Sequence, residues 1–172
     1  MSSNVGLSLI SSIEILKKIE KLDFLVLSSY ELTKLPLDLS HLKTLKELYL
    51  KDNPKLHYKK AFKILQNLEA LKILVLSNND IKKLPRNLEK LSQIKGLVLD
   101  ENSNINIKKL CERIQEMQRL EVLLLRNNNL SKLPVDLRGF SNLKLLELSN
   151  NVFSETEKSR IKNELPDTQV TF

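Results

Sequence analysis

The sequence is poor in cysteine and in glycine. Its single cysteine, Cys111, excludes an internal disulfide and any metal site built from several cysteines. Only three of the 172 residues are glycine, which argues against a glycine-rich phosphate-binding loop, a collagen and a flexible linker. No apolar run approaches the ~18–20 residues of a transmembrane helix. Because 41% of the residues are hydrophobic, the chain is not predicted to be disordered either.

The amino terminus contains no clear targeting signal. The opening residues Met1–Asn4 contain no lysine or arginine, and Gly6 and Ser8 interrupt the apolar stretch Val5–Ile10. A secretory signal peptide needs a basic start and an unbroken apolar core. The sequence is therefore a poor match to a signal peptide, and it leaves a cytoplasmic and an exported location both open.

Leucine is in large excess, with 38 copies, and it recurs at fixed intervals. A segment of the form L-x-x-L-x-L-x-x-N opens six times, and the intervals between openings alternate between 23 and 26 residues. The tripeptide K-L-P recurs every 49 residues, once in each 23-residue repeat. Such self-similarity is typical of solenoid proteins, in which each repeat forms one coil. The six segments begin at Leu22, Leu45, Leu71, Ile94, Leu120 and Leu143.

Each segment is predicted to contain one short strand. Its second and third leucines are two residues apart, a period that places both on one face of a β-strand. One strand cannot bury these leucines alone, but strands stacked in a parallel sheet enclose a continuous core. The pairs are Leu25 and Leu27, Leu48 and Leu50, Leu74 and Leu76, Leu97 and Leu99, Leu123 and Leu125, and Leu146 and Leu148.

These motifs resemble the leucine-rich repeat family, in particular its 23-residue L-P-x-x-L type that is common in short bacterial proteins. The repeats cover Leu22 to about Asn151 and lack the L-P-x-L-P signature of the secreted bacterial effectors. The resemblance implies an α/β solenoid, a right-handed arc of six coils with the parallel sheet on its concave face. It also implies a non-enzymatic module that binds protein partners.

An asparagine closes five of the six segments, where each strand ends and the chain turns inward. Its side chain can donate to and accept from the backbone of adjacent coils, and we expect it to satisfy groups that would otherwise be buried unpaired at a cost of ~1–3 kcal/mol each. The first segment has Tyr30 instead, which we interpret as variation at the end of the stack, with a binding role as the alternative. The column comprises Asn53, Asn79, Asn102, Asn128 and Asn151.

The two repeat lengths predict two kinds of return path on the outer side. In the shorter coils a proline follows the leucine of K-L-P and removes an amide donor, so we expect extended or short 3₁₀ segments there. In the longer coils apolar residues recur at helical spacing, which predicts a helix of two to three turns. These residues are Ala61, Ile64, Leu65 and Leu68, and then Ile107, Leu110, Cys111, Ile114 and Met117.

Both ends of the stack are predicted to be capped, because a bare terminal coil would expose its leucines. Ser11–Glu14 and Ser154–Glu157 fit capping boxes, which predict helices over residues 12–21 and from Ser154 to about Glu164. A short strand over Val170–Phe172 would then close the sheet. The expected organisation is one complete domain over residues 1–172, with repeats at 22–151 and caps at 1–21 and 152–172.

Two residues of each strand are expected to point away from the core, onto the concave face. Nine of these twelve positions are apolar or aromatic, whereas a solvated sheet face usually alternates apolar with polar residues. Polar columns, which include Asp100 and Glu101, follow toward the strand ends and form a rim, as in many protein interfaces. The concave face is therefore the predicted protein-binding site, with Arg126 as a candidate rim residue. Its apolar members are Phe24, Val26, Tyr49, Ile73, Val75, Val98, Val122, Leu124 and Leu145.

Other interpretations of the same residues remain open. Valine, isoleucine and tyrosine favour strands whatever their role, so the columns could be exposed without a partner. The face could also serve self-association into a homodimer. The net charge of +7 suggests a third possibility, attraction of the lysine-rich outer arcs to acidic surfaces, including anionic lipid. Aromatic residues that stack bases are not interleaved with these lysines, so specific nucleic-acid binding is not expected.

The sequence contains no recognisable constellation for catalysis. His41 and His57, the only histidines, fall on the first two outer arcs, where two ligands alone make a weak metal site. Cys111 lies on the apolar face of its predicted helix, which indicates a small core residue rather than a nucleophile. The sequence thus predicts no enzyme, no cofactor and no dedicated metal site.

Overall fold

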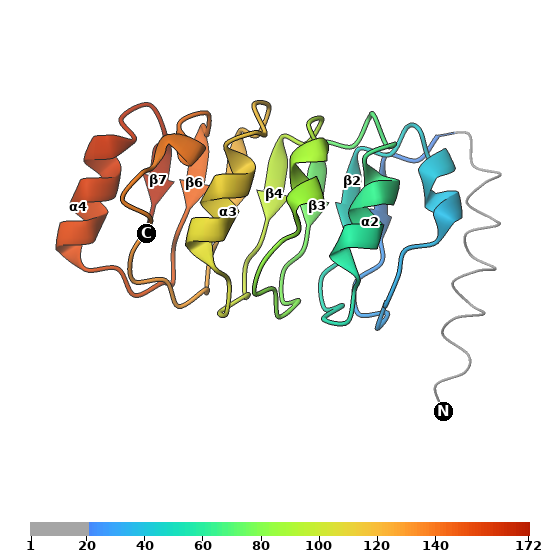
Figure 1. Ribbon diagram of the computed structural model, residues 1–172, viewed down its shortest axis with the longest axis horizontal. Helices are drawn as coiled ribbons and strands as arrows, with labels where there is room; N and C mark the ends of the chain where they lie inside the picture. The colour runs from blue at the N-terminus through green and yellow to red at the C-terminus, as the bar shows by residue number, and fades with distance from the viewer. Residues whose placement is uncertain (1–20) are drawn as a thin grey trace.

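The computed structural model describes residues 21–172, and Figure 1 shows them as a row of coils stacked along one long axis. Seven short strands lie side by side in one parallel sheet, in the order in which they occur along the chain. The expected amino-terminal helix over residues 12–21 lies outside the described residues, except for Lys21. The strands are β1 (Phe24–Val26), β2 (Glu47–Tyr49), β3 (Ile73–Val75), β4 (Gly96–Val98), β5 (Val122–Leu124), β6 (Leu145–Glu147) and β7 (Gln169–Thr171).

The register of the sheet follows the repeat. The middle leucines of β1 to β6 form one row of paired residues that runs from Leu25 to Leu146, and Val170 of β7 continues it. Because neighbouring residues of a strand point to opposite faces, each strand turns its middle residue into the core and its first and third residues outward. The predicted solenoid with a parallel sheet is confirmed.

The outer side of the described coils alternates 3₁₀ segments with α-helices, as the two repeat lengths predict. Each 3₁₀ segment follows shortly after a K-L-P proline, and each α-helix lies in a 26-residue coil. The α-helices end earlier than their apolar spacing suggests, at Leu65 and Ile114, but Leu68 and Met117 in the turns that follow are still buried. The segments are η1 (Leu37–His41), α2 (Tyr58–Leu65), η2 (Arg86–Lys90), α3 (Ile107–Ile114) and η3 (Arg138–Phe140).

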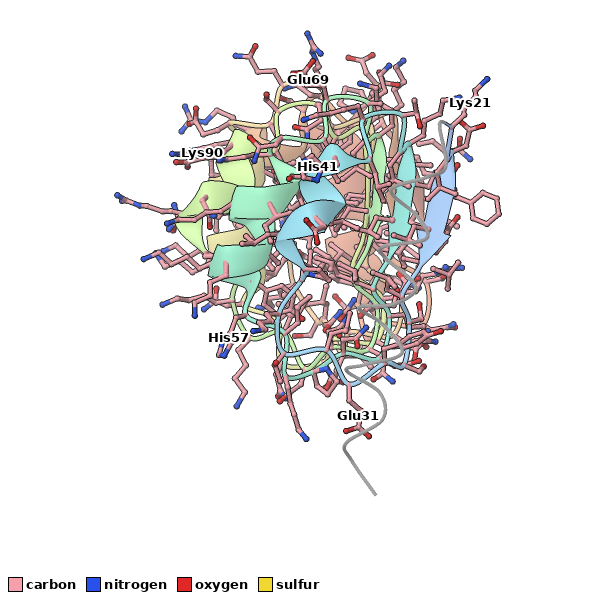
Figure 2. The ribbon with its side chains drawn as sticks, turned by 90° about the vertical axis from the view of Figure 1, so that its right-hand side faces the viewer. Lys21, Glu31, His41, His57, Glu69 and Lys90 are labelled. Carbon is pink, nitrogen blue, oxygen red and sulfur yellow. The ribbon has the colours of Figure 1, made fainter. Side chains whose placement is uncertain are left out.

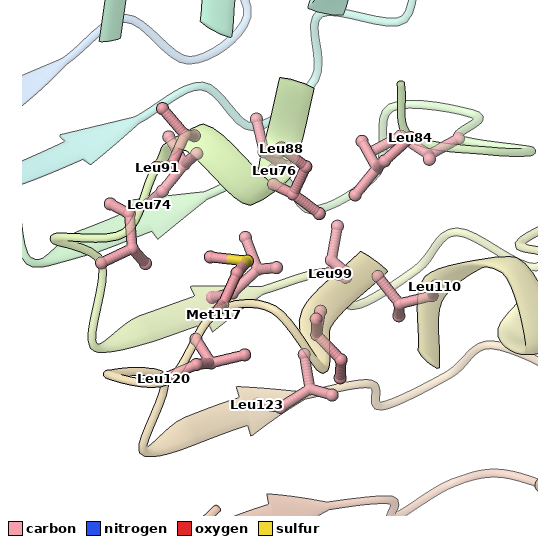
Figure 3. Close-up of a cluster of buried hydrophobic side chains, with 14 of the residues drawn as sticks. Leu74, Leu76, Leu84, Leu88, Leu91, Leu99, Leu110, Met117, Leu120 and Leu123 are labelled. Carbon is pink, nitrogen blue, oxygen red and sulfur yellow. The ribbon is translucent and has the colours of Figure 1, made fainter. Parts of the chain in front are cut away.

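The core is a continuous row of apolar side chains between the sheet and the outer segments. Figure 3 shows one section of it, in which Leu74 and Leu76 from the strand side lie toward Leu91 and Leu88 from the η2 side. These four side chains are fully buried, and burying one leucine stabilises the fold by roughly 1.5–3 kcal/mol. The spread of leucines along the chain therefore produces a core that extends the length of the stack and has no single centre.

The asparagine column lies at the turn that follows each strand and joins neighbouring coils. The backbone N–H of Asn53 donates to Oδ1 of Asn79 at 2.6 Å, and the N–H of Asn79 donates to Oδ1 of Asn102 at 3.0 Å. The chain of hydrogen bonds continues from Asn102 to Asn128 at 2.7 Å and from Asn128 to Asn151 at 2.9 Å. Each Nδ2 group meanwhile donates to backbone carbonyls, as that of Asn53 does to Leu27 and Leu50. The column therefore satisfies buried backbone groups of coils stacked one after another.

The carboxy-terminal end of the stack is covered by α4 (Glu155–Glu164), as the capping box predicts, and closed by β7, which begins one residue before the expected strand Val170–Phe172. The Ser154 side chain accepts from the backbone N–H of Glu157 at the start of α4. Phe153 packs edge-to-face on Phe172, with ring centroids 5.8 Å apart. Glu157 ties this cap to the last coil, because its Oε1 accepts from the Leu133 N–H at 2.9 Å and from Arg160 Nη2 at 2.7 Å.

We expect Glu157 to make the stability of the cap depend on pH. Its hydrogen bonds with Arg160 and with the Leu133 N–H lower the pKa of Glu157 below its ordinary value of 4.5. A carboxyl group with a lowered pKa stabilises the fold above its unfolded pKa, and this contribution is lost as the pH falls. Glu157→Gln should therefore lower the free energy of unfolding by about 1.5 kcal/mol at pH 7 and progressively less between pH 5 and 3.

Urea unfolding at several pH values measures this difference. Glu155→Gln is the matched control, because Glu155 lies on the same helix and pairs with Lys158 but is exposed, and we expect it to have no measurable effect. A deficit of Glu157→Gln that stays constant from pH 7 to pH 3 would contradict the assignment.

Candidate protein-binding face

The strand register brings the nine predicted apolar residues together on the side of the sheet that faces away from the core. The first residues of β1 to β6 form one column, and the third residues form a second beside it. Figure 2 looks along the stack and shows the sheet on one side of the molecule and the helical segments on the opposite side. The first column contains Phe24, Ile73, Val122 and Leu145, and the second contains Val26, Tyr49, Val75, Val98 and Leu124.

The exposure of this face is greatest at the amino-terminal end of the sheet. Phe24 is 61% exposed and Val26 is 52% exposed, whereas the apolar residues of β2 to β6 on this face are half-buried by their neighbours. Tyr30, which stands where the later coils have asparagine, is 42% exposed in the turn after β1. The apolar columns end toward the carboxy terminus, where Glu147, Gln169 and Thr171 take the outward positions.

The two polar side chains of the predicted site, Tyr49 and Arg126, already have hydrogen-bond partners within the protein. The Tyr49 hydroxyl donates to Oε2 of Glu47 at 2.6 Å, and this hydrogen bond raises the pKa of Tyr49. The Arg126 guanidinium binds the Asp100 carboxylate through Nε at 2.9 Å and Nη2 at 2.6 Å. This pairing raises the pKa of Arg126, and the two interactions hold both side chains in place.

The burial of Asp100 differs from the solvated polar rim that the sequence predicts. The sequence pattern placed it among solvated charges at the strand ends, but its side chain is only 7% exposed. Its Oδ1 accepts from the backbone N–H of Arg126 at 2.8 Å, in addition to the guanidinium contacts, so the pair joins two coils. Ser77, in the same column one coil earlier, is also buried, so this column is less exposed at its centre than expected.

The polar column that contains Glu101 has a backbone role that its composition does not indicate. In every coil the residue directly before the position of the asparagine column adopts a positive φ, between 51° and 61°, and none of these residues is glycine. Asparagine and aspartate tolerate this left-handed conformation better than other side chains. The residues are Ser29, Asp52, Asn78, Glu101, Asn127 and Asn150. Their polarity suits a tight turn as well as a rim.

The remaining candidates do not form a reactive centre. His41 lies in η1 and His57 precedes α2, and Figure 2 shows them at different levels of the helical side. Among residues 21–172, no three His, Cys, Asp or Glu side chains are grouped so that they could hold a metal ion. Cys111 is buried, and its burial raises the pKa of the thiol, so that the reactive thiolate is disfavoured.

Known proteins share the repeat and the fold of this chain. Residues 70–91 and 119–140 match the family model described as Leucine Rich Repeat, and no curated protein matches the chain. A solved leucine-rich repeat protein of Leptospira interrogans is 27% identical, with a TM-score of 0.54, over 91% of this chain and 50% of that one. TLR13, solved in complex with ssRNA13, is 24% identical with a TM-score of 0.61, over 90% of this chain and 22% of that one. The chain thus spans about half the length of the Leptospira protein.

Two coils of the chain thus match the leucine-rich repeat model, and the chain shares the fold of a solved leucine-rich repeat protein. The two matched segments start 49 residues apart and cover two of the three 23-residue coils that carry K-L-P. Leucine-rich repeats are typically binding modules and are generally non-catalytic. None of the helices in residues 21–172 has the length and apolar composition needed to cross a bilayer.

Proposed function

We propose that the protein is a binding module that holds a protein partner on the outward face of its sheet. The observation that carries this proposal is the pair of apolar columns over β1 to β6, which leaves large side chains such as Phe24 in solvent. Contiguous exposed apolar surface on a soluble domain usually marks an interaction site. The preset Tyr49 and Arg126 side chains would add directional contacts at little further cost in side-chain entropy.

The chemistry of this face favours a protein over a nucleic acid. TLR13 was solved with an RNA, but its likeness to this chain concerns the fold alone. The sheet face here is apolar, and its one exposed arginine, Arg126, is neutralised by Asp100. Phosphate groups require unpaired cations, which this face does not supply.

The proposal predicts that charges placed on the exposed end of the columns abolish partner binding. Phe24→Asp combined with Val26→Asp should weaken binding by at least 100-fold, because both side chains are more than half exposed and would carry charge into an apolar contact. Their exposure also means that the fold should be unaffected, which circular dichroism and thermal unfolding can verify. The readout is affinity capture followed by titration of the identified partner.

Leu37→Asp combined with Val135→Asp is the matched control, because these residues are also exposed and apolar but lie on the outer segments. Partner binding that survives the sheet variant, or that is lost equally in the control, would refute the proposal. Sedimentation of the free protein at several concentrations tests the alternative, in which the same face joins two copies. In that case the sheet variant alone should convert a dimer to a monomer.

A further inference from the structure

The helical side of the protein carries cations that have no acidic partner. Around α2 and η2, none of the exposed lysines and arginines takes part in an ion pair with any residue of the described chain. Several cations beside the sheet are paired by contrast, such as Lys46 with Asp23 at 3.0 Å and Lys95 with Glu121 at 2.9 Å. Figure 2 shows nitrogen-ended side chains fanning out on the helical side between the labelled Lys90 and His57. The unpaired cations include Lys59, Lys60, Lys63, Lys83, Arg86 and Lys90.

The sequence around α2 explains this local excess of positive charge. No aspartate or glutamate occurs between Asn53 and Leu68, so α2 has no acidic residue of its own. In η2 the single acid is Glu89, which is half-buried. Further along the helical side, Glu112 and Asp136 are each bound to a nearby cation. The net charge of the protein is therefore unevenly distributed, with an excess on this side.

Part of this charge lies along one edge of the stack. Lys59 and Lys60, at the start of α2, line one pocket of about 400 Å³ together with Lys83 and Pro85 of the second K-L-P segment. Forty-nine residues further on, Lys108 lines the corresponding pocket of about 460 Å³ with Pro134 and Val135. The first turns of the helices and the K-L-P segments therefore lie next to one another in successive coils.

Two apolar side chains project from the same edge. Leu37 is 80% exposed and Val135 is 92% exposed, and they are the most exposed large hydrophobic residues of the described chain. Both directly follow the proline of a K-L-P segment, and Arg86 occupies the equivalent position between them. Because equivalent residues of a solenoid align along its axis, a flat surface can touch all three positions at once. Neither projecting residue belongs to the sheet face.

We propose that this edge, defined by Leu37, Lys59, Lys60, Lys83, Arg86 and Val135, docks on the surface of an anionic phospholipid bilayer. Unpaired cations are attracted to anionic headgroups, and projecting apolar side chains enter the boundary between headgroups and acyl chains. An acidic protein would pair with the cations but would make fewer apolar contacts with Leu37 and Val135, which project from the surface. This attachment is peripheral and leaves the opposite, sheet face free to bind a partner.

Co-sedimentation with vesicles tests the proposal on the full chain. At 0.1 M salt the protein should bind vesicles of phosphatidylcholine with 30% phosphatidylserine and should not bind pure phosphatidylcholine. Each basic residue near an anionic bilayer strengthens binding roughly fivefold, so Lys59→Ala, Lys60→Ala and Lys83→Ala together should weaken it on the order of 100-fold. Leu37→Ser combined with Val135→Ser should weaken it about tenfold.

The sheet variant Phe24→Asp with Val26→Asp is the matched control and should bind these vesicles like the wild type. That result would separate the bilayer-binding edge from the proposed partner-binding face. Failure of the wild type to bind phosphatidylserine vesicles would overturn the proposal. Binding that is undiminished by Leu37→Ser with Val135→Ser would overturn it as well, because the vesicles would then be bound by charge alone and not by the edge as proposed.

Discussion

Replacing Asn102 by alanine should lower the free energy of unfolding by about 4 kcal/mol. Asn102 is fully buried at the middle of the asparagine column. Its Oδ1 accepts from the backbone N–H groups of Asn79 and Ile81, both at 3.0 Å. Its Nδ2 donates to the carbonyls of Leu76, Leu99 and Asp100 at 3.0 to 3.1 Å. Alanine removes all five contacts at once.

The size of this loss follows from the burial of the groups left behind. The N–H groups of Asn79 and Ile81 belong to buried residues, so water cannot replace Oδ1 without opening the stack. A buried donor without a partner costs about 1–3 kcal/mol, and the variant leaves two of them. Urea unfolding followed by circular dichroism measures the change.

Asn151→Ala is the matched comparison. Asn151 makes the same kind of contacts, with the N–H groups of Asn128 and Leu130 and the carbonyls of Leu125 and Leu148, but it is only half-buried at the end of the column. Water can enter from the exposed side of Asn151 at the end of the column, so we expect a loss of about 1–2 kcal/mol. Equal losses at the two positions, or a loss below about 1 kcal/mol at Asn102, would contradict a cooperative, buried column.

The periodic part of this structure could be predicted from the sequence because one rule is repeated in every coil. The spacing of the leucines sets which residues of each strand face the core, and alignment of the repeats then sets the register between strands. The pairing of Leu48 with Leu74, for example, is the alignment of their two repeats. The repeat lengths likewise placed the helices in the 26-residue coils, whereas the cap helix after Ser154 was predicted from its capping box.

The non-periodic part could not be predicted, because it depends on contacts that only some coils make. Asp100 and Arg126 occupy the same column in successive coils, yet their pattern gave no sign that one would be buried under the other. The pattern also made no prediction for Leu37 and Val135, which directly follow a K-L-P proline and lie outside the leucine columns, and both are exposed. In both cases the burial of a side chain depends on its neighbours in space more than on the repeat period.

Gly139 is a further feature of this kind, and it explains one of the few glycines in the chain. It lies in η3, and its φ is not positive, so its backbone conformation does not require glycine. The requirement is space, because a Cβ atom at this position would lie 2.6 Å from Cys111 Sγ and 2.7 Å from the Cys111 carbonyl oxygen. The absence of a side chain therefore lets η3 pack directly on α3.

Gly139→Ala should lower the free energy of unfolding by about 3 kcal/mol, because η3 and α3 must move apart to admit the methyl group. The matched control is Gly96→Ala on the sheet face, where the nearest atom, Ile73 Cγ1, would lie 3.5 Å from the new Cβ. That distance is an ordinary contact, and we expect a change of less than about 0.5 kcal/mol or a slight gain in stability. Thermal and urea unfolding of both variants measure the difference.

A second substitution identifies which atom enforces the glycine. Cys111→Ala removes the sulfur but leaves the Cys111 carbonyl oxygen in place, so combining it with Gly139→Ala should recover only part of the loss relative to Cys111→Ala alone. Full recovery would show that the thiol is the only obstacle and that the backbones of α3 and η3 have room to spare. A stability of Gly139→Ala equal to that of the wild type would mean that the two segments do not pack as closely as the structure requires.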